Sequence, residues 1–284
     1  MSRILVVDDD RATRHVLTAV LEHAGFEASA AKDGVDALSQ LRRRRFDLLL
    51  LDVWMPRMNG LELLTKLRTR RRRPRVVVMT SDDTPETILK AVREQAVRYV
   101  HKPVAPAALV ETVRQALEAT EIAPIEVLSA RPDWVEMVVP CTREAADRIQ
   151  SVMAHLDADL APELRESIAY ALRELVMNAV EWGGKLDPSR KVRISYLRAR
   201  RMLMYRIADP GSGFDIDNLP HSAIGQPADD PMAHMLVREE KGIRPGGFGL
   251  LMVRANVDEL LYNEKRNEVV FVKYLDAMSE GRQP

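Results

Sequence analysis

Short apolar runs separated by amphipathic stretches fill the first 120 residues of the chain. These runs predict strands at RILVVDD (3–9), FEASAA (26–31), FDLLLLDV (46–53), RVVVMTS (75–81) and RYVHKPV (98–104). Apolar residues at helical spacing predict helices over 12–24, 35–44, 60–70, 86–95 and 106–118. Strands that alternate with helices form a parallel sheet covered on both faces, and the continuous run LLLLDV fits a buried central strand. Residues 1–120 are therefore predicted to form a doubly wound (βα)5 domain, of the α/β class.

The pattern changes after residue 120. The stretch EIAPIEVLSARPD (121–133) carries two prolines and no helical period, so residues 121–131 are predicted to be a linker. The next segment predicts strands at 134–140, 190–197, 201–209 and 267–275, helices at 142–156, 162–182 and 249–261, and an irregular stretch over 214–244. Neighbouring strands with helices beside them indicate an α+β two-layer sandwich over 132–276, followed by a tail at 277–284.

Composition narrows the setting of the protein. The 284 residues are 46% hydrophobic and 30% charged, with 42 basic and 42 acidic residues, so two domains with proper cores are expected. Cys141 is the single cysteine, which excludes an intrachain disulfide and fits a reducing cytosol. The start MSRILVVDDD lacks the apolar core of a secretory signal, and no window is long and apolar enough for a membrane span. A cytoplasmic protein with no membrane contact is expected.

Basic residues are clustered despite the neutral total. LRRRRF (41–46) and RTRRRRPR (68–75) fall at the predicted C-terminal ends of two helices, where the helix dipole favours cations. Solvated helix ends are the simplest interpretation, and a docking or polyanion-binding patch is the alternative. Because no helix-turn-helix pattern follows the first domain, direct DNA binding is not expected.

Polar residues follow the predicted strands of the first domain at the edge where the strands end. These residues are Asp8, Asp9, Asp52, Thr80 and Lys102. Ligands of open parallel sheets bind at this edge, and three converging carboxylates call for a divalent cation such as Mg²⁺. With the ion bound, one carboxylate can act as nucleophile toward a phosphoryl group, and the lysine and threonine can stabilise the phosphoryl oxygens.

The stretches VVDDD, LLLLDVWMPRMNG, VVVMTS and YVHKP resemble the receiver domain of two-component response regulators. The resemblance implies that Asp52 is the phosphoacceptor and that Asp8, Asp9 and Asp52 hold the metal. It also implies that Thr80, Tyr99 and Lys102 form the switch. Two positions differ from the usual pattern, since Ser81 follows the threonine and Gln95 stands where a glycine usually ends the fourth helix.

The predicted helix over 162–182 carries polar residues that suit nucleotide chemistry. Its apolar stripe leaves Glu174 and Asn178 on another face, one turn apart, where a carboxylate can activate a proton donor and an amide can bind Mg²⁺. Downstream, ADPGSGF places Asp209 at a strand end, where it can accept a hydrogen bond from an exocyclic amine. The glycines Gly211 and Gly213 let a base and ribose approach the backbone.

A last glycine-rich stretch, RPGGFGLLMV (244–253), leads into a predicted helix. Gly247 and Gly249, followed by Leu250, leave the backbone bare at a helix N-terminus, which offers unpaired N–H groups to phosphate. The order E174-x-x-x-N178, D209-x-G211-x-G213, G247-x-G249-L250 resembles the GHKL ATP-binding fold of histidine kinases, gyrase and the anti-sigma-factor serine kinases. The flanking stretches WVEMVVPCTREAADRIQSVMAHL and NEVVFVKYL are most similar to the last branch.

The GHKL resemblance implies that Asn178 binds Mg²⁺, Asp209 recognises adenine, Glu174 is the general base and a lid lies within 214–246. One departure bears on catalysis: Trp182 stands where the serine-kinase branch usually has histidine, and an indole cannot shuttle a proton. Two functions therefore remain open. The first is a response regulator whose phosphorylation controls an ATP-dependent serine/threonine protein kinase in a partner-switching pathway. The second is a non-catalytic, ATP-stabilised, anti-sigma-like binding module.

Both functions imply the same classes of partner. A sensor histidine kinase or phosphotransfer protein would supply the phosphoryl group, and an anti-sigma-antagonist or sigma-like protein would receive the output. Phosphorylation of Asp52 adds roughly −1.5 to −2 charges at neutral pH. It is expected to reposition Thr80 and Tyr99 and to change how the receiver docks on the ATP domain, or how it pairs beside it in a homodimer.

Overall fold

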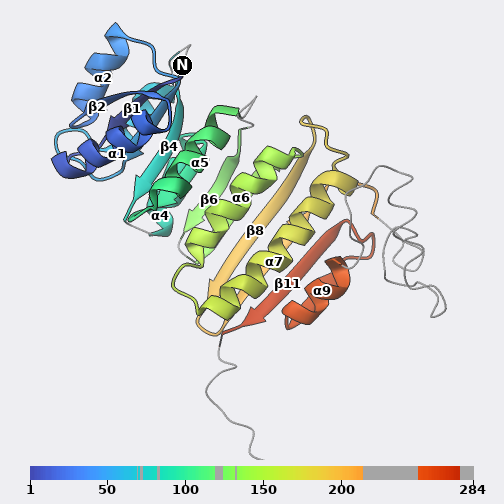
Figure 1. Ribbon diagram of the computed structural model, residues 1–284. Helices are drawn as coiled ribbons and strands as arrows, with labels where there is room; N and C mark the ends of the chain where they lie inside the picture. The colour runs from blue at the N-terminus through green and yellow to red at the C-terminus, as the bar shows by residue number, and fades with distance from the viewer. Residues whose placement is uncertain are drawn as a thin grey trace, which may run out of the picture. The chain divides into compact units, whose positions relative to one another are not determined.

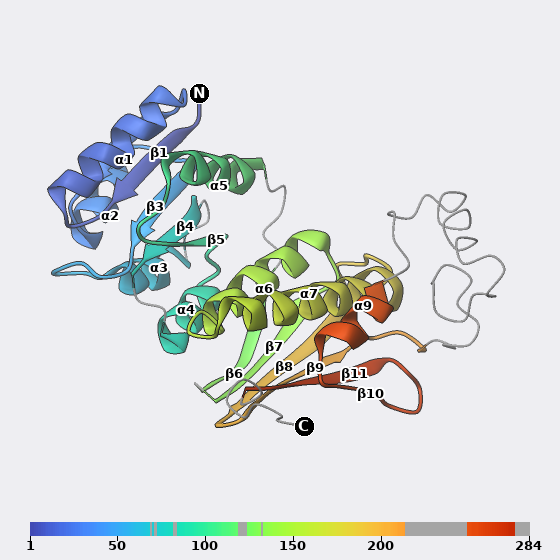
Figure 2. The ribbon, with the colours of Figure 1, turned by 60° about the horizontal axis from the view of Figure 1, so that its bottom comes forward.

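The chain folds into two compact units, Met1–Ile125 and Glu126–Pro284. The computed structural model describes residues 1–68, 70, 73–81, 84–118, 124–131, 133–213 and 249–275. Each unit has its own sheet with its own helices (Figures 1 and 2).

The first unit is a parallel sheet covered by helices on both faces. Its elements are β1 (Arg3–Val7), α1 (Arg11–His23), β2 (Glu27–Ala31), α2 (Gly34–Arg43), β3 (Leu48–Asp52), α3 (Gly60–Arg68), β4 (Arg75–Thr80), α4 (Pro85–Arg93), β5 (Arg98–His101) and α5 (Pro106–Glu118). The strand order is β2-β1-β3-β4-β5, and every pair is parallel. Because the order reverses direction between β1 and β3, the carboxyl ends of these two strands form the crevice where such sheets bind ligands.

The sheet of the first unit is buried on both sides, as the run LLLLD of β3 predicts. Alternate residues such as Leu48 and Leu50 join a core with Leu17 of α1 and Val113 of α5. On the other face, α2 contacts α3 and α3 contacts α4. The doubly wound (βα)5 prediction is confirmed.

The second unit is an antiparallel sheet with a layer of helices on one face. Its elements are β6 (Glu126–Arg131), β7 (Trp134–Pro140), α6 (Arg143–Leu156), α7 (Pro162–Asn178), a π-helical turn (Ala179–Gly183), β8 (Lys191–Ala199), β9 (Met202–Ala208), α9 (Gly249–Asn256), β10 (Glu259–Tyr262) and β11 (Glu268–Tyr274). The strand order is β10-β11-β9-β8-β7-β6. Figure 2 shows α6, α7 and α9 lying over the same face of this sheet. The α+β two-layer prediction is confirmed.

Aromatic residues form the centre of the core beneath these helices. Tyr205 stacks on Phe271 with ring centroids 4.9 Å apart, and Tyr196 meets Tyr205 edge-on at 5.1 Å. Both tyrosine hydroxyls donate hydrogen bonds to Asp157, which follows α6, so the buried phenols have a polar partner. This cluster ties the α6–α7 connection to the middle of the sheet.

Two predicted segments differ from the observed elements. The linker predicted over 121–131 is too long, because Glu126–Arg131 pair with β7 as the edge strand β6. The helix predicted over 249–261 ends at Asn256, and 259–262 form β10 instead. Here the backbone N–H of Asp258 bonds to the carbonyl of Val272, and the Asp258 carboxylate accepts from the backbone N–H of Tyr274, so pairing with β11 replaces the last helical turns.

Some predicted features lie outside the described residues. They are Gly247, the lid over 214–246 and the tail over 277–284. Among the residues that the structure describes, no helix combines the length and apolarity needed to cross a bilayer.

Candidate functional sites

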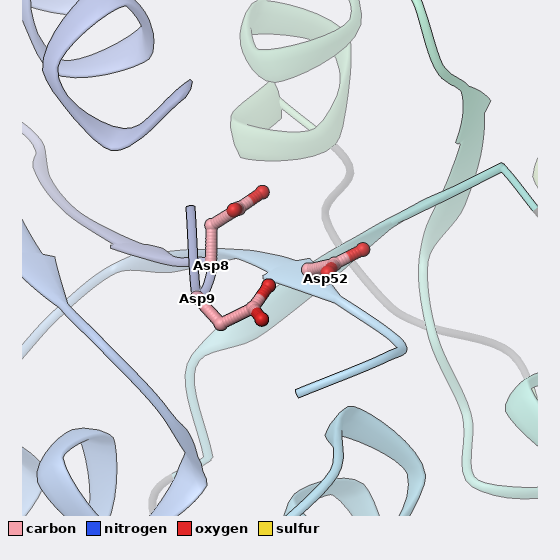
Figure 3. Close-up of side chains that lie close together, drawn as sticks. All are labelled: Asp8, Asp9 and Asp52. Atoms are coloured by element: carbon pink, nitrogen blue, oxygen red, sulfur yellow. The ribbon is translucent and has the colours of Figure 1, made fainter. Parts of the chain in front are cut away.

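Three carboxylates meet at the crevice of the first unit. Asp8 and Asp9 follow β1, Asp52 ends β3, and one oxygen from each lies within 4.8 Å of the others (Figure 3). Lys102, just beyond β5, places its Nζ 2.7 Å from Oδ2 of Asp8 and 2.9 Å from Oδ1 of Asp52. The sequence therefore predicted this group of four residues correctly as neighbours, because parallel strands bring their carboxyl ends to one edge.

Burial controls the electrostatics of this pocket. It raises the pKa of Asp52, while the hydrogen bond and charge of Lys102 act in the opposite direction. Burial also lowers the pKa of Lys102, but its hydrogen bonds and charge contacts with Asp52 and Asp8 outweigh this, and the net shift is upward. Three carboxylates against one ammonium leave an excess of negative charge. An oxygen-lined, partly buried site of this kind fits a divalent cation such as Mg²⁺.

The remaining predicted switch residues lie on the adjoining strands. Thr80 is buried at the end of β4, and its carbonyl accepts from the backbone N–H of Lys102 at 2.9 Å. Tyr99 is buried in β5, where it pairs with Val78 of β4. The structure thus joins the backbone of Thr80 to that of Lys102, and Tyr99 lies on β5, three residues before this lysine.

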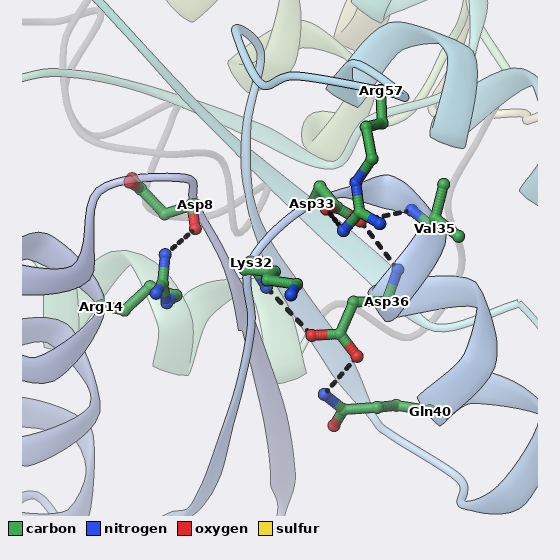
Figure 4. Close-up of polar contacts among 8 residues, drawn as sticks. All are labelled: Asp8, Arg14, Lys32, Asp33, Val35, Asp36, Gln40 and Arg57. Atoms are coloured by element: carbon green, nitrogen blue, oxygen red, sulfur yellow. Dashed lines mark hydrogen bonds and ion pairs between the residues drawn. The ribbon is translucent and has the colours of Figure 1, made fainter.

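The loop that follows Asp52 is anchored at its far end and at its middle. Its far end returns to the strand because the backbone N–H of Gly60 bonds to the carbonyl of Val53 at 2.8 Å. Its middle is tied to the start of α2, since Arg57 pairs with the buried carboxylate of Asp33 (Figure 4). The backbone N–H of Gly34 also bonds to the carbonyl of Met58. Sequence reasoning missed this anchor, because no short-range pattern links residues 33 and 57.

In the second unit, α7 brings Glu174 to the beginning of α9. A Cβ atom added to Gly249 would meet the end of the Glu174 side chain, so the carboxylate lies directly against this glycine. The N-terminal N–H groups of a helix attract negative charge, and Glu174 lies beside such an end. The structure therefore brings the base candidate Glu174 and Gly249 together.

Asp209 lies in a pocket of bare backbone. A Cβ on Gly183 or on Gly211 would meet the Asp209 carboxylate, and the backbone N–H of Gly211 donates to Oδ1 of Asp209 at 2.7 Å. Burial raises the pKa of Asp209, and this hydrogen bond counteracts the shift. A partly buried carboxylate with one oxygen already engaged suits recognition of a single donor group, such as an exocyclic amine.

Two residues of this pocket were missed by sequence reasoning. Gly183 belongs to the Gly-Gly pair that ends the helix, which is a usable signal for close approach. Asn267 has no such signal, yet its carbonyl accepts from the backbone N–H of Asp209 at 2.9 Å. Its side-chain amide donates to the carbonyl of Gly211 at 3.1 Å.

The π-helical turn explains how α7 reaches both parts of the site. Asn178 is the last residue of α7, and the wide turn Ala179–Gly183 follows it, closed by a bond from the N–H of Gly184 to the carbonyl of Ala179 at 2.8 Å. Such turns are frequently found at functional sites. Of the other predicted residues, Leu250 is half-buried on α9. Gly213 has φ +86° and packs on the backbone of Lys265.

Family comparisons divide the chain as the structure does. Residues 4–114 match the response regulator receiver domain, and residues 140–273 match the histidine kinase-like ATPase domain. The acidic pocket falls in the first match, and Glu174, Asn178 and Asp209 fall in the second.

Two relatives with similar sequences support the first match. The chain is 35% identical over 182 residues to the DNA-binding response regulator MtrA of Mycolicibacterium paratuberculosis, which covers 64% of this chain and 79% of the relative. It is 39% identical over 119 residues to the response regulator MprA of Mycobacterium leprae, covering 42% and 52% respectively. A CheY-like receiver domain structure from Methanospirillum hungatei is 31% identical, with a TM-score of 0.40, and covers 42% of this chain and 94% of its own.

Proposed function

The chain belongs to the response regulators, and from its union of a receiver domain with a histidine kinase-like ATPase domain we propose that phosphorylation of Asp52 controls an ATP-dependent serine/threonine kinase of the anti-sigma-factor type. The phosphoryl donor is a sensor histidine kinase or phosphotransfer protein. The substrate is an anti-sigma-antagonist-like protein, in a partner-switching pathway of the cytoplasm.

The acidic pocket supports the receiver half of this proposal. An oxygen of Asp52 forms the new bond to phosphorus while the bond from phosphorus to the donor nitrogen breaks. Lys102 is placed to neutralise the phosphoryl oxygens, since its Nζ already lies 2.9 Å from Asp52. Asp8, Asp9 and Asp52 would hold Mg²⁺, which supplies positive charge between carboxylates and phosphoryl oxygens. Thr80 ends β4 and pairs with His101, the residue that precedes Lys102, so its hydroxyl is the candidate for a hydrogen bond to the phosphoryl group.

The Glu174, Asn178 and Asp209 constellation supports the output half. Asp209 and the bare backbone of Gly183 and Gly211 accept the adenine edge, and the start of α9 faces phosphate. Asn178 would hold the metal of Mg-ATP. Glu174 takes the proton of a substrate hydroxyl, whose oxygen bonds to the terminal phosphorus as ADP leaves.

One observation carries the enzymatic proposal: the Glu174 carboxylate lies against Gly249 at the beginning of α9. This places a base candidate where a terminal phosphate would meet helix N–H groups. Calorimetry with Mg-ATP should give saturable binding to wild type and a loss of about tenfold or more in affinity for Asn178→Ala. With Mg-ATP labelled on its terminal phosphate and a candidate antagonist as acceptor, Glu174→Gln should bind Mg-ATP normally and transfer no label to the antagonist. Equal transfer by wild type and Glu174→Gln would remove the proposed base.

Trp182 favours a second candidate function. It occupies the position where the serine-kinase branch carries histidine, and its indole is 40% exposed at the end of the π-helical turn. In this second function the ATPase domain sequesters a sigma-like regulator, and ATP only orders the fold. Label transfer at background level together with nucleotide-dependent partner retention would favour it. Trp182→His, which restores a proton-carrying side chain, should then raise transfer.

A further inference from the structure

The N-terminal edge of the receiver sheet carries a dense group of exposed cations. The C-terminal ends of α2, α3 and α4 meet along this edge, because α2 contacts α3 and α3 contacts α4. We call the exposed basic side chains of these helix ends the arginine edge, and they are Arg42, Arg43, Arg44, Arg45, Lys66, Arg68, Lys90 and Arg93. The phosphoacceptor pocket lies at the opposite, C-terminal edge of the same strands.

The cations of this edge are not neutralised within the described part of the receiver unit. Arg68 approaches Glu94 at 4.0 Å, and the other seven make no ion pair or hydrogen bond through their side chains. Two acids at the same edge are already engaged: Glu27 pairs with Arg3 at 3.0 Å, and Asp47 accepts from the backbone N–H of Arg3 at 2.7 Å. A chain with equal numbers of acidic and basic residues has therefore concentrated unpaired positive charge in one place.

The helix dipole accounts for only part of this charge. It favours cations in the last turn of a helix, which covers Arg42 and Arg43 of α2, Lys66 and Arg68 of α3, and Lys90 and Arg93 of α4. Arg44 is the C-cap in an extended conformation, and Arg45 lies beyond the helix. Four adjacent guanidinium groups also repel one another, so an internal structural role gives no reason for the last two.

The composition of the arginine edge indicates the class of partner that it binds. None of the exposed large apolar residues falls within 41–46, 66–68 or 90–95. Protein interfaces draw their affinity from buried aromatic and aliphatic anchors, which this edge lacks. A surface made only of cations, mostly guanidinium groups that form paired hydrogen bonds to phosphate, matches a regularly spaced polyanion.

We propose that the arginine edge binds the phosphate backbone of nucleic acid without reading its sequence. Contacts to phosphate fix a protein on a duplex but carry no sequence information, so no recognition helix is needed. This role is separate from the kinase proposal and from nucleotide binding in the second unit. It leaves the Asp52 pocket open to a phosphodonor, because the two surfaces lie at opposite ends of the strands.

The test uses the full chain and a fluorescent mixed-sequence DNA duplex, followed by anisotropy from 50 to 200 mM salt. Wild type should bind with a log–log salt slope of about −0.9 per phosphate contacted, and a duplex of different sequence should bind equally well. Replacing Arg42, Arg43, Arg44 and Arg45 by Gln should weaken binding by roughly tenfold or more and make the slope shallower by about 3 to 4.

A matched control removes four exposed arginines elsewhere: Arg114, Arg131, Arg173 and Arg200, each changed to Gln. This control should retain most of the affinity, and both variants should unfold at the wild-type urea midpoint. Equal loss in the two variants would show a net-charge effect and overturn the proposal. So would retention on anionic lipid vesicles or on poly-glutamate under conditions where the duplex does not bind.

Discussion

At the scale of single residues, Asp157 is the clearest source of pH dependence. Its carboxylate is buried between two tyrosine hydroxyls, at 2.6 Å from Tyr205 and 3.3 Å from Tyr196, and burial raises its pKa to about 6. Since the native pKa lies above the unfolded one, the native state binds the proton more tightly. The contribution to stability is complete below about pH 4 and is lost as the pH rises through 6. Between pH 5 and pH 7.5, the titration of Asp157 alone should lower the free energy of unfolding by about 1 kcal/mol.

This prediction is checked by urea unfolding of wild type and Asp157→Asn at both pH values. In a Trp54→Phe background, fluorescence reports only Trp134 and Trp182 of the second unit. The amide stays neutral and can still accept from Tyr205, so the difference between the two proteins should grow by about 1 kcal/mol in favour of the variant as the pH rises. A difference that is constant across the range would show that Asp157 does not titrate there.

Asp33 and Arg57 make a second prediction at this scale. Asp33 caps α2 by accepting from the backbone N–H groups of Val35 and Asp36, and it also pairs with Arg57, whose φ is +66°. Asp33→Ala should cost about 1–3 kcal/mol of receiver stability, because the cap is lost and Arg57 keeps a strained backbone without its partner. Asp33→Asn retains the cap and should cost less than half as much.

The measurement for this pair is urea unfolding in a Trp134→Phe, Trp182→Phe background, where Trp54 reports the receiver alone. Arg57→Gly separates the two effects, since glycine removes the strain together with the ion pair. Equal midpoints for Asp33→Ala and Asp33→Asn would show that the cap contributes little.

Residue-level prediction from sequence worked where backbone topology decides position. Asp8, Asp52 and Lys102 are far apart in the chain, but each follows a parallel strand, so their meeting follows from strand order. Gly183 and Asn267 lie beside Asp209 for a different reason. The path of the π-helical turn places Gly183 there, and the pairing register of β9 and β11 places Asn267 there. The Gly183–Gly184 pair is a local signal for the first, but no local residue pattern encodes the second, so the Asp209 site was only half predictable.

At the scale of elements, the end of α4 shows a conflict between cap and sequence. Gln95 occupies the left-handed position with φ +59°, and bonds from its N–H to the carbonyl of Val92 and from Ala96 to Ala91 close the helix. Glycine adopts this conformation without strain, so Gln95→Gly should stabilise the receiver by up to about 1 kcal/mol. The gain is reduced by loss of the hydrogen bond from Gln95 to the carbonyl of Ile125.

Gln95→Ala is the matched control for this cap. It loses the same side-chain hydrogen bond but keeps the strain, so it should be less stable than Gln95→Gly by about 1 kcal/mol in urea unfolding. If the two variants unfold at the same midpoint, the left-handed backbone at this position carries no cost.

Errors in the predicted elements also have a common physical cause. The stretch 257–262 continues the apolar spacing of α9, and Glu126–Arg131 lack a clear alternation. Both became edge strands, β10 and β6, because pairing with β11 and β7 satisfies their backbone groups. The secondary structure of such marginal segments depends on their tertiary partner. The segment LLLLD of β3 is apolar enough for its sequence alone to predict a buried strand.

At the scale of the whole molecule, the proposed function requires energetic coupling between the candidate sites of the two units. Each unit has its own sheet and its own core, and each carries one of the two candidate sites. If occupation of the Asp52 pocket changes the affinity for Mg-ATP by some factor, Mg-ATP must change the affinity of that pocket by the same factor. Couplings of this kind are typically about 1–3 kcal/mol, or roughly 5–150-fold.

Beryllofluoride, a phosphoryl mimic, allows the coupling to be measured in both directions. Calorimetric titration with Mg-ATP, with and without beryllofluoride, should differ by at least about fivefold in affinity, and the reverse titration, followed by Trp54 fluorescence, should differ by the same factor. Asp52→Asn removes the acceptor and should abolish both differences while leaving Mg-ATP binding intact. Asn178→Ala should also abolish both differences, because it weakens the binding of Mg-ATP. Tight binding of both ligands with no mutual effect would mean that the receiver controls its partner without passing through the ATP site.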